Sequence, residues 1–236
     1  MTGRILSGAR AIFFDAVGTL LFPCPSAPHV YAQVACRNGL LLSEEVIRRR
    51  FREAYRQQEE IDRLSGWVTS EQRERDRWQA IVGATLDGVA DPQACFAELY
   101  EHFSRPEAWR LHPEAADVLA RLREQGYTLG LGSNYDSRLR RVLDGYPELA
   151  PLRERAVISS AVGFRKPVAE FFHEVVRQAG SSPAEVVFVG DDVVNDYHGA
   201  CTAGLKAVLL GPITPTEPNS ARPPLRIGTL RELLER

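Results

Sequence analysis

Lysine is almost absent from this chain of 236 residues, because Lys166 and Lys206 are the only lysines in a total of 29 lysine and arginine side chains. The basic residues are balanced by 31 acidic ones, which leaves a formal net charge of −2. A chain of this charge has no large basic field to attract nucleic acid or an anionic membrane surface. We therefore expect neither as a partner.

Cysteine is scarce as well, and long apolar runs are missing. The four cysteines are far apart and form no C-x-x-C pair, which argues against a zinc site and against a disulfide framework. No apolar run approaches the length of a membrane-spanning helix, and the N-terminal region lacks the apolar stretch of a signal peptide. These absences predict a cytoplasmic protein with reduced thiols.

From Leu111 onward, short apolar runs alternate with segments of helical periodicity. The apolar runs predict strands at 127–132, 156–158, 185–189 and 206–210. The periodic segments predict helices at 113–125, 137–143, 168–179, 194–202 and 230–234. The proline-rich stretch 212–224 predicts a surface loop. Because this alternation is typical of βαβ units, the expected fold class is α/β, a Rossmann-like doubly wound parallel sheet.

Residues 27–105 carry a different pattern. Apolar side chains at helical spacing continue through this stretch without a convincing strand, and Ser43 is placed to cap a long helix. The stretch interrupts the α/β alternation directly after its first strand. We therefore predict an all-helical insert, with the chain crossing to and from it near residues 21–25 and 107–111.

Polar residues follow several of the predicted strands at the point where each strand ends. Asp15 comes directly after the apolar run 11–14 and precedes Gly18 and Thr19. The comparable motifs further along are Ser133-Asn134, Lys166-Pro167, and Gly190-Asp191-Asp192 with Asp196. Taken singly, each is explained as a turn, a helix cap or a solvated side chain. Because the carboxyl ends of parallel strands open onto one crevice, their joint occurrence predicts a shared site.

The order of these motifs resembles the haloacid dehalogenase superfamily, in which an Asp, a Ser or Thr, a Lys and a paired acidic motif follow one another. The stretch Ser133-Asn134-Tyr135-Asp136-Ser137-Arg138-Leu139 is similar to that of the haloacid dehalogenase-like hydrolase domain-containing 3 group. So is Ser104-Arg105-Pro106 followed by Trp109. The resemblance implies a core domain of residues 1–22 and 109–236 and a helical cap domain of residues 23–108.

The resemblance also implies an enzyme that hydrolyses a small-molecule phosphate ester with Mg²⁺ as its cofactor. Asp15 would attack phosphorus and form an aspartyl-phosphate, and Thr19 would orient Asp15. The residues that would hold the phosphoryl oxygens are Ser133, Asn134 through its backbone N–H, and Lys166. Those that would hold Mg²⁺ are Asp15, the backbone carbonyl of Val17, Asp191 and Asp196. Two roles are possible for Asp192: it could accept hydrogen bonds that support the metal ligands, or it could be a helix N-cap.

Val17 departs from the family's pattern. Phosphatases of the family carry a second Asp at this position, which protonates the leaving group, and valine cannot do so. Two alternatives to a phosphatase therefore stay open, a catalytically silent binding protein and a 2-haloacid dehalogenase. Dehalogenases of the family also lack the second Asp, but they need no metal, so the retained acidic residues argue against them. The absence of lysine from the cap excludes the family's phosphonate-cleaving mechanism.

The cap is expected to recognise the substrate through residues near Pro23–Tyr31 and through the loop at Trp67. Closure of the cap would exclude water from the site. The sequence indicates neither the particular compound nor an oligomeric state.

Overall fold

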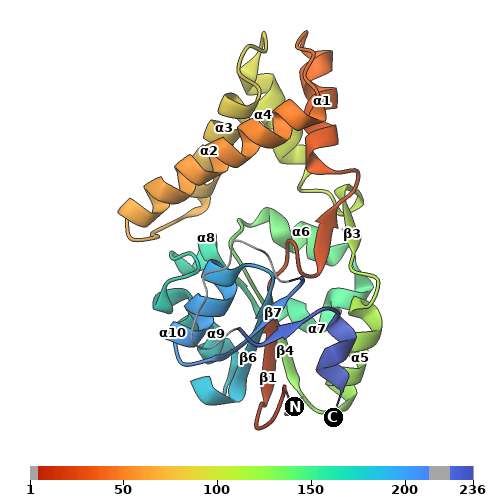
Figure 1. The fold of residues 1–236 in the computed structure, drawn as a ribbon, viewed down its shortest axis with the longest axis vertical. Helices are drawn as coiled ribbons and strands as arrows, with labels where there is room; N and C mark the ends of the chain where they lie inside the picture. Colours follow the sequence, from red (N-terminus) through yellow and green to blue (C-terminus); the bar gives the residue numbers. More distant parts are fainter. Residues whose placement is uncertain (1–4, 213–223, 236) are drawn as a thin grey trace.

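The computed structural model describes residues 5–212 and 224–235 of the chain. Within these residues, six parallel strands form one sheet in the order β5-β4-β1-β6-β7-β8 (Figure 1). The strands are β1 (Ala11–Phe14), β4 (Thr128–Ser133), β5 (Ala156–Ile158), β6 (Val186–Gly190), β7 (Lys206–Leu210) and β8 (Arg226–Ile227). The predicted parallel α/β sheet is confirmed.

Helices cover both faces of this sheet (Figure 1), because its central strands are apolar on both sides. In β1, Ile12 and Phe14 belong to one buried cluster, whereas Ala11 and Phe13 belong to a second cluster on the other face. The core helices are α5 (Ala115–Glu124), α6 (Arg138–Asp144), α7 (Ala150–Arg153), α8 (Ser159–Val162), α9 (Ala169–Ala179) and α10 (Gly199–Thr202). The first cluster includes side chains of α5 and α6, and the second includes side chains of α9.

The strand order places β1 between β4 and β6, where the chain turns from one half of the sheet to the other. Phe14, the last residue of β1, is in register with Leu131 of β4 and Val189 of β6. The residues that follow these strands therefore emerge near one another at one edge. In doubly wound sheets such an edge, at a switch in strand order, is the usual place of a binding crevice.

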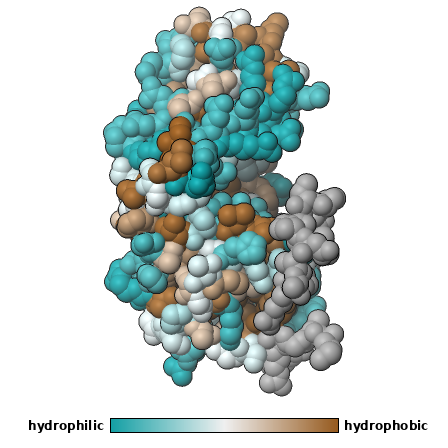
Figure 2. All heavy atoms as spheres, turned by 60° about the vertical axis from the view of Figure 1, so that its left-hand side comes forward, coloured by the Kyte–Doolittle hydropathy of each residue, from teal (hydrophilic) through white to brown (hydrophobic). Residues whose placement is uncertain are grey.

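Between β1 and β4 the chain builds a separate helical layer above this edge (Figure 1). Its helices are α1 (Ala27–Arg37), α2 (Glu44–Leu64), α3 (Glu71–Thr85) and α4 (Pro92–His102). All four contribute to an apolar cluster of their own, and the outer surface of this layer is mostly hydrophilic in Figure 2. The predicted all-helical insert is confirmed, and Ser43 caps α2 as expected by accepting a hydrogen bond from the Val46 N–H. No helix among the described residues is long and apolar enough to cross a membrane.

Two short strands join the insert to the core. They are β2 (Leu21–Pro23) and β3 (Trp109–Leu111), which pair antiparallel with Phe22 opposite Arg110. Both lie within the stretches where the crossings between insert and core are predicted. Their hydrogen bonds tie the outgoing and returning chain together, so the insert is attached by a paired ribbon rather than by two independent linkers.

Two of the predicted helices take other forms. The segment expected as a helix at 194–202 begins as a π-helix at Val193–His198 and continues as α10. The closing segment at 230–234 is a 3-10 helix. A π-helix holds an additional residue in each turn, a local feature that apolar periodicity does not reveal. The loop predicted at 212–224 lies, apart from its two ends, outside the described residues.

A buried ion-pair network joins the insert to the core. The carboxylate of Asp62 on α2 accepts hydrogen bonds from Arg73 Nη2 at 2.6 Å and from Arg77 Nε at 2.9 Å, both on α3. Arg165, in the loop before α9, pairs with Glu74 of α3, and its Nε lies 3.7 Å from Asp62 Oδ2. Asp62, Arg77 and Arg165 are buried. Since an unpaired buried charge is costly, this network holds α2, α3 and the core loop together.

We expect Asp62→Ala to lower the free energy of unfolding by about 3–5 kcal/mol, because it leaves the buried guanidinium of Arg77 without its carboxylate. Chemical denaturation measures the change. Glu60→Ala is the matched control, since Glu60 pairs with Arg63 on the exposed side of the same helix and its loss should have little effect. Similar losses in the two variants would contradict the role assigned to Asp62.

Candidate active site

Three aspartates gather at the edge where β1 and β6 end. Asp15 follows β1, Asp191 follows β6, and Asp196 lies in the π-helix that comes next. Each offers one carboxylate oxygen, and these three oxygens lie within 4.8 Å of one another. Asp15 and Asp196 are buried, whereas Asp191 is exposed. The structure thus brings together the three carboxylates that the motifs assign to a metal ion.

Lys166 lies against this acidic cluster from inside the core. Its ammonium group donates to Asp15 Oδ1 and to Asp196 Oδ1, each at 2.7 Å, and to the carbonyl oxygen of Gly132 at 3.0 Å. Burial lowers the pKa of Lys166, but the neighbouring carboxylates of Asp15 and Asp196 outweigh burial, and the net shift is upward. The ammonium therefore stays charged and can attract an anionic substrate.

The acidic cluster carries more negative charge than Lys166 balances. Burial raises the pKa of Asp15 to about 8, because the attraction of Lys166 does not offset burial together with repulsion from Asp196 and Asp191. Partial loss of hydration beside the buried carboxylates, with repulsion from Asp196, raises the pKa of Asp191 to about 6. When all three carboxylates ionise, they exceed the single ammonium by two charges. An all-oxygen donor set with this excess fits a hard divalent cation such as Mg²⁺.

The turn after β1 packs closely against Asp191. Gly18 has a φ of 101°, in the left-handed region, and a Cβ at this position would overlap the Asp191 carboxylate. The hydroxyl of Thr19 donates to Asp191 Oδ1 at 3.2 Å. Thr19 therefore orients Asp191, which corrects the prediction that it orients Asp15. The reason is the glycine turn, which carries residue 19 across to the end of β6.

Asp192 caps the helix that carries Asp196. Its Oδ1 accepts hydrogen bonds from the backbone N–H groups of Val194 and Asn195, each at 2.8 Å. Its own N–H donates to Asp196 Oδ2 at 3.0 Å. Of the two roles left open by the sequence, the structure shows the helix N-cap. Gly190 completes the arrangement, since a Cβ there would overlap the Asp196 carboxylate.

Ser133 and Asn134 lie beside the aspartates at the end of β4. Ser133 is buried and lines the cavity above them. The Asn134 side chain forms two hydrogen bonds with the backbone of Lys166. Its Nδ2 donates to the Lys166 carbonyl at 3.0 Å, and its Oδ1 accepts from the Lys166 N–H at 2.7 Å. These bonds fix the loop that presents the ammonium. Sequence reasoning considered the Asn134 backbone and missed this side-chain role, which depends on two loops meeting in space.

A cavity of about 350 Å³ lies between the acidic cluster and the helical insert. Its core side includes the predicted site residues Asp15, Val17, Ser133, Asn134, Lys166, Asp191 and Asp196. Thr19 is not among the residues that line it, in keeping with its contact behind Asp191. The side formed by the insert is largely aromatic. The predicted site residues therefore face a cavity large enough for a small molecule.

The insert contributes to this cavity in part where the sequence predicts. Pro23, Ala27 and Tyr31 line it, as expected for the stretch 23–31. Trp67 does not line it, which corrects the second expectation. Its backbone carbonyl instead accepts a hydrogen bond from the Arg165 N–H at 3.0 Å, so the Trp67 loop docks on the core loop that leads into Lys166.

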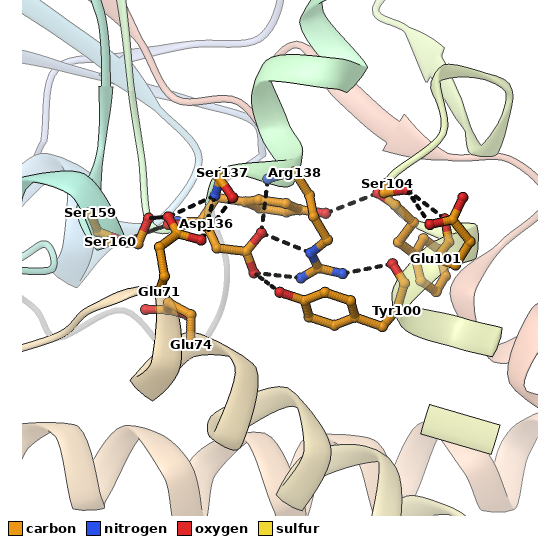
Figure 3. A network of polar contacts seen from close by, with 12 residues as sticks. Glu71, Glu74, Tyr100, Glu101, Ser104, Asp136, Ser137, Arg138, Ser159 and Ser160 are labelled. Carbon is orange, nitrogen blue, oxygen red and sulfur yellow. Dashed lines mark hydrogen bonds and ion pairs between the residues drawn. The ribbon is translucent and has the colours of Figure 1, made fainter. Parts of the chain in front are cut away.

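A polar network holds the insert against the core beside the cavity (Figure 3). Arg138 pairs with Asp136 through Nε at 2.8 Å and Nη2 at 2.7 Å, and donates from Nη1 to the Tyr100 carbonyl at 3.1 Å. The Tyr100 ring lies 3.5 Å from the guanidinium carbon, and its hydroxyl donates to Asp136. Glu71 of α3 accepts from the Ser137 N–H and hydroxyl. Sequence reasoning noted this stretch as a resemblance and missed its function as a contact with the insert.

Comparisons with known proteins assign this chain to a family. A profile of the family described as "Hydrolase: haloacid dehalogenase-like hydrolase" matches residues 9–204. Haloacid dehalogenase-like hydrolase domain-containing protein 3 of Mus musculus is 32% identical over 219 residues, which cover 88% of this chain and 84% of that protein. Phosphoserine phosphatase of Thermus thermophilus is 36% identical over 137 residues, or 58% of this chain and 55% of that protein.

A solved structure shows the same fold. L-2-haloacid dehalogenase from Xanthobacter autotrophicus, with chloropropionic acid covalently bound, matches with a TM-score of 0.75 at 19% identity, over 95% of this chain and 96% of that one. At this identity the likeness concerns the fold alone. The family profile and the murine relative confirm the resemblance seen in the motifs, and the chain belongs to the haloacid dehalogenase-like hydrolase family.

Proposed function

We propose that this protein is a Mg²⁺-dependent phosphatase that hydrolyses small-molecule phosphate esters through an aspartyl-phosphate on Asp15. The observation that carries the proposal is the meeting of Lys166 with the three carboxylates on one side of a cavity. The ammonium would attract an anionic substrate, and the carboxylates would bind a divalent cation. The phosphoserine phosphatase relative favours phosphate-ester hydrolysis as the reaction class.

In the proposed reaction, a carboxylate oxygen of Asp15 forms a bond to phosphorus. The ester P–O bond breaks, and its electron pair leaves on the departing oxygen. Water then adds to the phosphorus of the aspartyl-phosphate, which releases inorganic phosphate and restores the carboxylate. The proton that water loses balances the one that the departing oxygen gains from solvent. Lys166, 2.7 Å from Asp15 Oδ1, stabilises the charge on the transferring phosphoryl oxygens, and the Ser133 hydroxyl donates to one of them.

The proposed ligands of Mg²⁺ are Asp15, the backbone carbonyl of Val17, Asp191 and Asp196. Thr19 and Gly18 fix Asp191, and Asp192 positions Asp196 through its backbone N–H. When bound, the ion would neutralise the excess carboxylate charge and polarise the phosphoryl oxygens. The chain's own residues supply the nucleophile, the ammonium and the cavity.

A catalytically silent binding protein is the second candidate, and Val17 is the observation that favours it. Val17 lines the cavity beside Asp15 and has no proton to donate. The loss of a general acid typically slows a reaction by about 10²–10⁴-fold. The first candidate therefore predicts slow turnover of esters with poor leaving groups, and the second predicts binding of a phosphorylated ligand without turnover.

Hydrolysis of a panel of phosphate esters, with and without added Mg²⁺, tests the proposal. Phosphate release that requires Mg²⁺ supports the phosphatase. If a folded protein binds Mg²⁺ but hydrolyses none of the esters, the phosphatase proposal is rejected in favour of the catalytically silent binding protein. Halide release from a 2-haloacid without metal would instead identify a dehalogenase.

We expect Asp191→Asn to weaken Mg²⁺ binding by at least about tenfold, because an anionic oxygen ligand becomes a neutral one. Isothermal titration calorimetry measures the affinity. Asp192→Asn is the matched control: it removes the same charge from the neighbouring residue, and asparagine caps a helix as well as aspartate does. An equal loss in both variants would mean that general charge, rather than ligation by Asp191, governs binding.

A further inference from the structure

The insert gives the cavity an aromatic roof, which includes Tyr31, Phe51, Tyr55, Trp78, Tyr100 and Phe103. Phe51 on α2 lies at its centre, with ring centroids 5.7 Å from Tyr31, 6.1 Å from Tyr55 and 6.4 Å from Trp78. Phe51, Tyr55 and Trp78 are half-buried, so part of each ring remains open to a ligand. Aromatic surfaces of this kind favour a flat apolar group in offset or edge-to-face contact.

Three polar groups beside the cavity are paired within the protein. The Tyr100 hydroxyl donates to Asp136, and the Tyr135 hydroxyl and the Trp109 indole N–H both donate to the Phe103 carbonyl. These three groups are not available to the hydroxyl groups of a sugar or polyol, which would lose water against the aromatic rings and regain hydrogen bonds only in part. A loss of hydrogen bonds to water that is only partly compensated disfavours strongly polar leaving groups.

The charges around the cavity disfavour an acidic leaving group. Among the described residues that line it, the cationic ones are Lys166 and Arg138. Lys166 is engaged with two carboxylates, and Arg138 is held by Asp136 through two hydrogen bonds. The exposed residues on this lining include Asp191 and Asp192. A carboxylate on the leaving group would therefore meet negative charge without a free cation to offset it.

We propose that the substrate is a phosphate monoester whose leaving group is an uncharged planar aromatic. Its ring would pack against Phe51, Tyr55 and Trp78, with its phosphoryl group at Asp15 and Lys166. The inference rests on the proposed phosphatase function and names its substrate class. A cavity of about 350 Å³ accommodates a small ligand of this kind. A phenolate departs readily without a proton donor, which matches the valine beside Asp15.

Calorimetric titration of the Mg²⁺-loaded protein with non-hydrolysable phosphonates tests the proposal apart from turnover. The probes are benzylphosphonate, methylphosphonate and phosphonoacetate. We expect benzylphosphonate to bind at least about tenfold more tightly than methylphosphonate, because its ring buries apolar surface. Phosphonoacetate, which carries a carboxylate, should bind no more tightly than methylphosphonate. Equal affinities for the first two probes, or a preference for phosphonoacetate, would overturn the inference.

Phe51→Ala should remove most of the preference for benzylphosphonate over methylphosphonate. Tyr55→Leu is a second variant, in case the first destabilises the insert. Phe22→Ala is the matched control, since Phe22 contacts His112 in the linker region and does not line the cavity. A preference that survives in folded Phe51→Ala and Tyr55→Leu proteins would overturn the assignment of the roof.

Turnover separates this inference from the function on which it rests. Benzyl phosphate and ethyl phosphate both release alcohols, so a higher kcat/KM for benzyl phosphate reports on the ring rather than on a phenol's acidity. A protein that hydrolyses both equally well is a phosphatase without the inferred preference. A protein that hydrolyses neither ester nor any other in the panel, yet retains the preference for benzylphosphonate, lacks the proposed function but keeps the aromatic site.

Discussion

Asp15→Asn should abolish hydrolysis, with a loss on the order of 10⁴-fold or more in kcat, because an amide cannot act as the nucleophile. The substitution keeps the size of the side chain at the end of β1 and removes its charge. Asp15 Oδ1 lies 2.7 Å from the Lys166 ammonium, which is the group proposed to hold the phosphoryl oxygens. The other two carboxylates of the cluster are the proposed metal ligands Asp191 and Asp196, so neither is expected to replace Asp15 as the nucleophile. Phosphate release from an activated aryl ester with Mg²⁺ is the measurement.

Asp144→Asn is the control for this experiment. Asp144 ends α6 with its side chain 70% exposed, and the same change of charge there should leave the rate unaltered. Circular dichroism establishes that both variants are folded. Undiminished phosphatase activity in Asp15→Asn would assign the reaction to a different site or to a contaminating enzyme.

Val17→Asp should raise the turnover of alkyl phosphates more than that of aryl phosphates. Alkoxide leaving groups need a proton, and the new carboxyl supplies one at the position where the family's phosphatases carry it. The gain can approach about 10²–10⁴-fold when the carboxyl adopts the productive rotamer, and the added negative charge beside Asp15 acts against it. The ratio of kcat/KM for alkyl and aryl esters measures the effect in each protein.

Val17→Asn separates proton donation from the other effects of the substitution. Asparagine has the shape of aspartate and forms hydrogen bonds, but it does not act as a general acid. We expect it to leave the alkyl-to-aryl ratio at the wild-type value. A rise as large as that of Val17→Asp would mean that polarity, rather than a proton, is what position 17 lacks.

The parallel sheet and the helical insert were predictable because the pattern of apolar residues within each short segment indicates whether that segment forms a strand or a helix. The apolar run 11–14 and the run 185–189 form adjacent central strands, and the Ser43 cap opens α2 where its sequence indicates. The prediction failed locally at Val193–His198, where a π-helix replaces the regular turn. There the Tyr197 N–H donates to the carbonyl of Asp192, five residues earlier, at 3.1 Å, and apolar periodicity does not encode this bond.

The motifs also predicted which residues would lie close together, but not which contacts each side chain would make. Asp15, Lys166, Asp191 and Asp196 assemble because parallel strands place their carboxyl ends at one edge of the sheet. Thr19 contacts Asp191 rather than Asp15, since the direction of a side chain in a turn is set by the turn's backbone conformation at Gly18. The two hydrogen bonds between the Asn134 side chain and the Lys166 backbone likewise form where two separate loops come into contact.

By itself, the sequence determined the sheet, the helical insert and the order of polar residues along the strand ends, because these follow from local apolar patterns and chain order. The order of the polar motifs carried the resemblance to the family. Apart from the stretch 23–31, only the tertiary structure decided which residues of the insert face the site. Phe51 and Trp78 line the cavity although nothing in the sequence singles them out within the predicted insert, whereas the Trp67 loop was expected there. Which faces of α2 and α3 turn toward the core depends on the packing of one layer on the other through Asp62, Glu74 and Arg165. Those contacts join residues far apart in the chain, and no local pattern records them.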